Sequence, residues 1–97
     1  MLVLKILARR GPMHGYAITT HIEKASSEVL RVEEGSLYPA LHRLEELRLV
    51  KARWTVTANK RRARVYEITK AGRERLDAQE KRWRAVTFAV GQVLERI

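Results

Sequence analysis

Hydrophobic positions recur at helical spacing in the first half of the chain. Residues 1–10 are rich in aliphatic side chains and predict a mostly buried helix. Gly11-Pro12 ends it, because proline cannot continue the hydrogen-bond ladder. No capping residue precedes this helix, so we expect it to begin before Met1. A second helix is predicted over about residues 15–25, with Ile18, Ile22 and Ala25 along one side.

A third helix is predicted over about residues 36–48, after an extended connector at residues 29–32. Ser36 is a suitable N-cap, and Pro39 then falls in the first turn, where its missing N–H leaves no bond unmade. The side chains expected to face the core are Leu37, Leu41, Leu44 and Leu47. Those expected on the exposed side are Tyr38, His42 and Arg43.

The period changes to two after Leu49, which predicts a β-hairpin over about residues 50–69, called the wing below. Two alternating segments are joined by residues 58–63, a loop long enough that we expect a mobile tip. Trp54 and Tyr66 are interpreted as the apolar face of the wing root, not as platforms for stacking bases.

A last long helix is predicted from Thr69 or Lys70 to Ile97. Apolar residues recur there every seven positions, the pattern of a helix that packs along another helix. Gln79 interrupts this seam near the helix start. The residues expected at a dimer interface are Leu76, Trp83, Val86, Val90, Val93 and Ile97.

These elements predict a mainly α fold with a small β-hairpin (α+β), in the order αααββα. The second and third helices resemble a helix-turn-helix, so the fold expected is a winged helix-turn-helix with a long C-terminal helix. We divide the chain into a DNA-binding domain at residues 1–69 and a dimerisation helix at residues 70–97.

Charge points to the class of partner. The 97 residues carry a net charge of +9, with a pI of about 10.7, which favours a polyanion such as nucleic acid. Residues 51–70 hold seven basic side chains against one acid, which is +6 of the +9. There is no cysteine, no apolar stretch near the roughly 20 residues of a membrane span, and no signal-peptide pattern. We therefore expect a soluble, cytoplasmic protein.

Several residues of the third helix are candidates for DNA contact, each with a structural alternative. Arg43 could bind a guanine edge, or it could pair with Glu46, Glu45 or Glu33. Ser36 could bind a phosphate as well as cap the helix. Tyr38 could contact the sugar-phosphate backbone or pack against the first helix, and His42 could touch DNA or be only solvated.

The wing carries the stronger electrostatic signal. Four cations lie within five residues and repel one another, which favours an anionic partner over a merely soluble turn. These residues are Lys60, Arg61, Arg62 and Arg64.

Three segments together resemble the PadR family of transcriptional regulators: GPMHGY at residues 11–16, EEGSLYPALHRLEE at 33–46 and RRARVYEITKAGRERL at 61–76. The resemblance implies a homodimer, joined by its C-terminal helix, that binds an inverted-repeat operator and represses until an effector binds. It assigns Ser36, Tyr38, Pro39 and His42 to the recognition helix. His14 and Tyr16 would open the second helix near the DNA backbone, or pack the turn around Gly15.

The resemblance also bears on a small-molecule effector. Some short members of the family hold a ligand pocket at the dimer interface, and Trp83 could stack a planar aromatic effector there or be dimer core. Chains of this family usually carry more residues before the first helix, so we expect a late start here.

Other classes of function receive little support. The three histidines have no metal-ligand spacing and there is no Gly-rich phosphate loop, so we expect no enzyme, no cofactor and no metal. The rival interpretation is a basic winged-helix module that binds RNA or an acidic protein without promoter selectivity.

Overall fold

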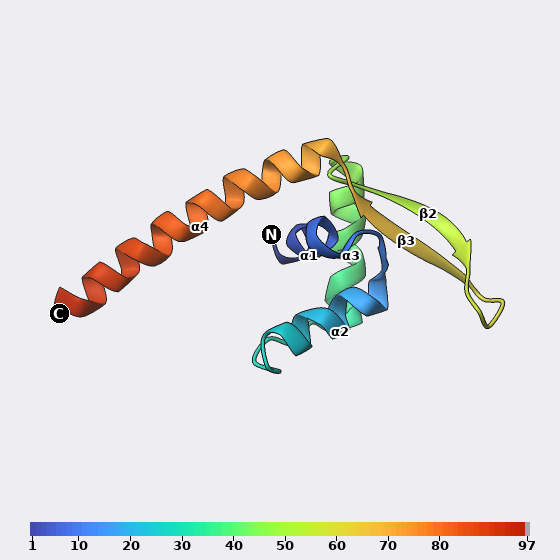
Figure 1. The fold of residues 1–97 in the computed structure, drawn as a ribbon, viewed down its shortest axis with the longest axis horizontal. Coiled ribbons are helices and arrows are strands. Elements are labelled where there is room, and N and C mark those ends of the chain that lie inside the picture. Colours follow the sequence, from blue (N-terminus) through green and yellow to red (C-terminus); the bar gives the residue numbers. More distant parts are fainter. Residues whose placement is uncertain (97) are drawn as a thin grey trace.

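The computed structural model describes residues 1–96, and of Glu34 the backbone only. Its elements follow the predicted order, with one short strand added (Figure 1). They are α1 (Leu2–Arg10), β1 (Met13–His14), α2 (Gly15–Ala25), α3 (Glu34–Glu46), β2 (Val50–Val56), β3 (Arg62–Ile68) and α4 (Lys70–Arg96).

The sheet has three antiparallel strands in the order β1-β3-β2, where the sequence predicted two. The added strand β1 pairs Met13 with Tyr66 and His14 with Val65. Within the wing, the two alternating segments pair as β2 and β3, with Trp54 opposite Arg64. β1 therefore ties the segment between α1 and α2 to the base of the wing.

The core lies where α1, α2 and α3 meet the base of the wing and the start of α4. Its most buried side chains are Leu4, Leu7, Ile18, Leu37, Leu41 and Val50. The prediction that Leu47 belongs to this core is wrong, since Leu47 is 50% exposed. α3 ends at Glu46, so Leu47 lies at its C-cap and leaves the buried side.

The start of α3 also differs from the prediction. Ser36 is not the N-cap: the helix begins at Glu34, and the carbonyl of Glu33 accepts hydrogen bonds from Ser36 and Leu37 at 3.0 Å. Pro39 is consequently the sixth residue of α3, not part of its first turn. Because proline has no N–H, the carbonyl of Gly35 loses the donor that a helix would normally supply.

α4 projects away from the rest of the molecule (Figure 1). The molecule measures 57 × 29 × 21 Å with a radius of gyration of 15.6 Å, against about 12.5 Å for a compact chain of this length. Leu76 is only 6% exposed and belongs to the protomer's own core, which corrects its assignment to the dimer seam. Ile97, also assigned to that seam, lies outside the described residues.

Two contacts hold the first part of α4 against the domain. Lys5 of α1 lies 2.7 Å from Glu80, and this hydrogen bond lowers the pKa of the Glu80 carboxyl. At the start of α4, Thr69 donates its N–H to the carbonyl of Leu49 and its hydroxyl to that of Arg48, at 3.0 and 2.7 Å. Gly72 donates to the Thr69 hydroxyl, which thus caps the helix.

We expect Gly72→Ala to destabilise the protein by about 1–3 kcal/mol, because a Cβ there would collide with the backbone carbonyl of Leu49. Gly35→Ala is the matched control, since a Cβ on Gly35 would meet open space. Thermal melts followed by circular dichroism compare the two variants with the parent. Equal melting temperatures for all three would contradict close packing at Gly72.

Candidate nucleic-acid interface

The exposed side of α3 carries most of the residues predicted to contact DNA. Ser36, Tyr38, Pro39, His42 and Arg43 are all exposed. Tyr38 packs against the start of α2 rather than against α1: a Cβ on Gly15 would lie 2.8 Å from the Tyr38 ring. The glycine in the HGY segment therefore makes room for a tyrosine of α3.

Glu45 and Glu46 of α3 have partners other than Arg43. His42 lies 2.8 Å from Glu46, one helical turn further along. Glu45 binds Arg64 of the wing at 2.9 Å. Arg43 lies beside the recess between α1, α3 and α4, of about 550 Å³, so it occupies a flank of the exposed side of α3.

The residues predicted to open α2 lie beside the wing root. His14 is the N-cap of α2, and its ring stacks on that of Tyr16 with centroids 5.5 Å apart. Tyr16 is exposed, whereas Nδ1 of His14 is buried without a hydrogen-bond partner among the described atoms. Both line a cavity of about 380 Å³ that also touches Tyr38, Trp54 and Arg62.

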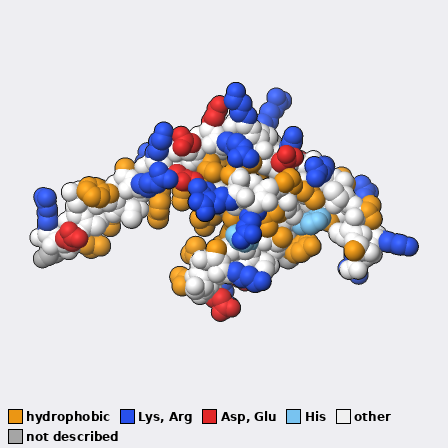
Figure 2. Space-filling model, in the orientation of Figure 1, with side chains coloured by type: hydrophobic (Ala, Val, Ile, Leu, Met, Phe, Trp, Pro, Cys, Tyr) orange, Lys and Arg blue, Asp and Glu red, His pale blue; other side chains and the backbone are white. Residues whose placement is uncertain are grey.

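The wing tip is a tight turn closed by its own backbone. Thr57 donates to the carbonyl of Arg61 at 2.8 Å, and Lys60 donates to that of Thr57 at 2.9 Å. Lys60 has a φ of 59°, a left-handed conformation that favours glycine. Among the described residues, no ion pair involves Lys60, Arg61 or Arg62, and Figure 2 shows Lys and Arg at the end of the wing.

The wing root combines aromatic rings with arginines. The guanidinium of Arg62 lies 4.9 Å from the centre of the Trp54 ring, and that of Arg64 lies 5.5 Å from it. Tyr66 is buried, and burial raises the pKa of its phenol while the positive charge of Arg64 opposes that rise. The interpretation as wing root fits Tyr66, but Trp54 is half exposed and supports two cations.

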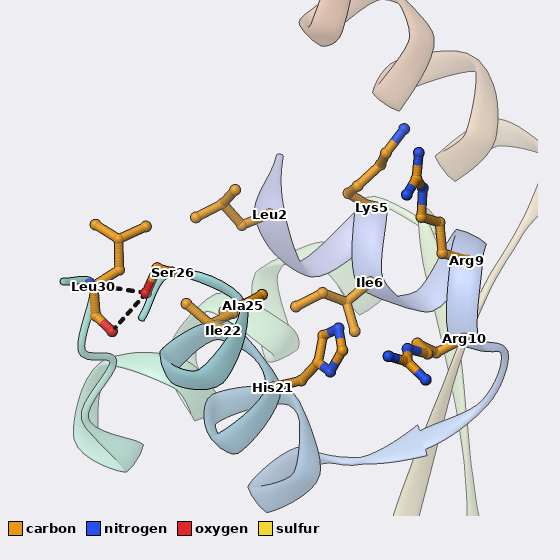
Figure 3. A pocket seen from close by; sticks show the side chains of 10 residues that line it. All are labelled: Leu2, Lys5, Ile6, Arg9, Arg10, His21, Ile22, Ala25, Ser26 and Leu30. Atoms are coloured by element: carbon orange, nitrogen blue, oxygen red, sulfur yellow. Dashed lines mark hydrogen bonds between the residues drawn. The ribbon is translucent and has the colours of Figure 1, made fainter. Parts of the chain in front are cut away.

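A further recess of about 380 Å³ lies between α1 and α2, and the sequence analysis did not anticipate it. Its floor includes Ile6 and Ile22. Figure 3 shows Lys5 and Arg9 pointing toward α4, whereas Arg10 and His21 point toward one another.

The outer part of α4 exposes a row of large hydrophobic side chains (Figure 2). The predicted seam residues Trp83, Val86, Val90 and Val93 are all exposed in the protomer, Trp83 at 59%. Leu94, which the sequence analysis missed, follows Val90 by four positions and extends the same side. Phe88 is exposed too, but it lies two positions from Val86 and Val90 and therefore on another side.

In residues 1–96, no cluster of His, Asp and Glu side chains is arranged to hold a metal ion. Over the same part of the chain, none of the helices combines the length and apolar character needed to cross a membrane.

An exposed third helix followed by a basic hairpin defines a winged helix-turn-helix protein. The chain belongs to the Transcriptional regulator PadR-like family, whose pattern matches residues 3–78. The predicted family and fold class are confirmed, and the family is one of transcriptional regulators.

Two solved structures have the same architecture. A PadR family transcriptional regulator from Eggerthella lenta is 29% identical, with a TM-score of 0.82 over 97% of this chain and 81% of that one. Bacillus subtilis PadR in complex with operator DNA is 24% identical, with a TM-score of 0.72 over 80% of this chain and 44% of that one. At this identity the second likeness concerns the fold alone.

One curated relative is similar in sequence. It is an uncharacterized 37.1 kDa protein in transposon TN4556 of Streptomyces fradiae, 47% identical over 79 residues. The match covers 81% of this chain but only 21% of that protein, so this chain corresponds to a small part of its length.

Proposed function

We propose that the protein is a sequence-specific regulator that binds double-stranded DNA through α3 and the wing. The observation that carries this proposal is the wing tip, where three cations form no ion pair with the described side chains and stand beyond a helix with an exposed polar side. The membership in a family of transcriptional regulators supports it, as does the operator complex of Bacillus subtilis PadR.

The two elements have different tasks in this proposal. α3 enters the major groove, where Arg43 reads a base edge and Ser36, Tyr38 and His42 contact the backbone or bases. His14 and Tyr16 approach the backbone from the start of α2. Lys60, Arg61 and Arg62 bind phosphates, which adds affinity without selecting a sequence.

Fluorescence anisotropy tests the function directly. We expect the protein to bind one duplex from its own upstream region more tightly than scrambled duplexes, by about 10³-fold or more, with a steep dependence on salt. Duplexes tiled across that region locate the operator. Equal weak binding to every duplex would refute the proposal and favour the rival, a basic module for RNA or acidic proteins.

The wing is expected to bind phosphates. Arg61→Ala together with Arg62→Ala should weaken binding to all duplexes similarly and reduce the slope of log affinity against log salt by about one unit per lost contact. The control is Lys24→Ala with Lys81→Ala, which removes the same charge from the exposed surfaces of α2 and α4. A slope that changes equally in both double variants would exclude a specific role for the wing.

We further propose that the protein is a homodimer joined by α4, with residues 1–69 as the DNA-binding part and residues 70–97 as the dimerisation part. Each protomer exposes Trp83, Val86, Val90 and Val93 along one side of α4, and burying them requires a partner. A two-fold dimer presents two α3 helices and therefore fits an inverted repeat. Such binding at a promoter blocks transcription, which makes the regulator a repressor.

Val90→Asp, like Trp83→Asp, should yield monomers. A carboxylate in the seam has no partner, so we expect the dissociation constant of the dimer to rise by about 100-fold or more. Phe88→Asp is the matched control, because it places the same charge on another exposed position of α4, outside the seam. Sedimentation velocity distinguishes the variants, and a Val90→Asp protein that stays dimeric would disprove the seam.

Trp83 is also the position that we propose for a small aromatic effector. It lines a recess of about 260 Å³ together with Met1 and Val86, where a planar ligand would stack on the indole. A ligand held there would lie between the two α4 helices of the proposed dimer and could change how they pack.

A further inference from the structure

Among the described side chains, one ion pair links the wing to α3. Nη2 of Arg64 lies 2.9 Å from Oε2 of Glu45, in the last turn of the helix. The two side chains are 33% and 31% exposed, so the pair is more shielded from water than a typical surface pair. Arg64, grouped by sequence with the cations of the wing tip, is thus already engaged within the molecule.

Aromatic rings hold the same guanidinium from the side. It lies 5.5 Å from the centre of the Trp54 ring and 5.8 Å from that of Tyr66. Its Nε is buried without a partner among the described atoms, so Arg64 depends on Glu45 for compensation of its charge. The Trp54 ring also supports Arg62, which lies beside the tip. A continuous row of contacts therefore runs from Glu45 through Arg64 and Trp54 to Arg62.

The acid of the wing itself, Glu67, does not make such a link. Glu67 lies 3.9 Å from Lys51 and 3.8 Å from Arg53, all within the hairpin. Lys51 is opposite Glu67 in the register, and the alternation of the strands places this cluster on the face away from Trp54 and Arg64. Of the ion pairs that residues 1–96 form, Glu45–Arg64 is the one that joins the wing to α3.

We propose that Arg64 is a positioning residue: held by Glu45 and by the rings of Trp54 and Tyr66, it fixes the direction of the wing relative to α3. This inference rests on the proposed DNA-binding function. α3 and the wing tip must meet the same duplex at once, so an error in the angle between them weakens both sets of contacts. Arg64 contributes to binding through Arg62 and the tip, and not as a phosphate contact of its own.

The outer part of the wing has few other contacts that could fix its direction relative to α3. A two-stranded hairpin alone is marginally stable in water, and the third strand β1 reaches only Val65 and Tyr66. Trp54 and Val56 are exposed, so this part of the wing packs on no core.

The first experiment measures the wing without DNA. In a Trp83→Phe background, shown to keep the parent's oligomeric state by sedimentation, Trp54 is the only tryptophan. We expect Glu45→Gln to lower the fluorescence anisotropy of Trp54 and to raise its quenching by acrylamide. Glu67→Gln removes an equal charge from the other face of the wing and should change neither. Equal effects of the two variants, or no effect of Glu45→Gln, would overturn the proposal.

The second experiment separates positioning from contact. On the selected operator, Arg64→Ala should lower affinity about tenfold with an unchanged salt slope, whereas Arg62→Ala should reduce the slope by about one unit. Arg64→Lys keeps the charge but not the planar fork, so it should not restore affinity. A slope that falls by one unit for Arg64→Ala, or full rescue by lysine, would make Arg64 a phosphate contact and overturn the proposal.

The results distinguish a failure of the proposed function from a failure of the positioning role. If the parent protein selects no duplex, the proposed function is wrong, and the Trp54 measurement still decides whether Glu45 and Arg64 fix the wing. If the parent selects its operator but Glu45→Gln behaves like Glu67→Gln in the Trp54 measurement, or Arg64→Ala lowers the salt slope by one unit, the regulator stands and the positioning role is refuted.

Discussion

The contact between Leu49 and the start of α4 is the constraint on which the arrangement depends. The Leu49 carbonyl accepts the Thr69 N–H, and Gly72 lies so close to it that no side chain fits between. Leu49 follows α3 and precedes β2, whereas Thr69 follows β3 and precedes α4. One backbone contact therefore joins the end of the helix proposed to read DNA, both strands of the wing and the helix proposed to dimerise. A shift of α4 at this point moves the base of the wing with it.

The sequence predicted the elements well where a period determines them. The spacing of Leu37 and Leu41 indicated the buried side of α3, and alternation indicated the two strands of the wing. The predictions from sequence were wrong where tertiary contacts determine the structure. Two residues cannot show a period, so β1 was missed, and Leu76 fits a heptad although the protomer's own core buries it. Ser36 has the chemistry of an N-cap, yet the helix already begins after Glu33.

The residues of the candidate site also divide into those that a local pattern predicts and those whose role depends on tertiary contacts. Clustered cations in and beside a turn can be recognised from sequence when no acid lies near them in the chain, and Lys60, Arg61 and Arg62 are in this position, since residues 57–63 contain no acid. Arg64 could not be separated from them, since its partner Glu45 is 19 positions away and was considered only as a partner for Arg43. That pairing depends on how the wing folds back beside α3, which no local pattern encodes. Likewise the HGY segment is informative only once Tyr38 is seen to cover Gly15.

The distribution of acids determines what the net charge of +9 can do. Glu67 lies near Lys51 and Arg53 and neutralises part of their charge, and Glu45 forms an ion pair with Arg64. These cations near the base of the wing are therefore paired with acids of the same molecule. The tip has no such acid, and Lys60 occupies a left-handed position that glycine would occupy at lower cost, by about 1 kcal/mol. Lysine at that position therefore lowers the stability of the turn but adds a positive charge. The field of the wing is therefore concentrated at its end, about as far from α3 as the hairpin reaches, where it can act on a phosphate backbone while α3 occupies the groove.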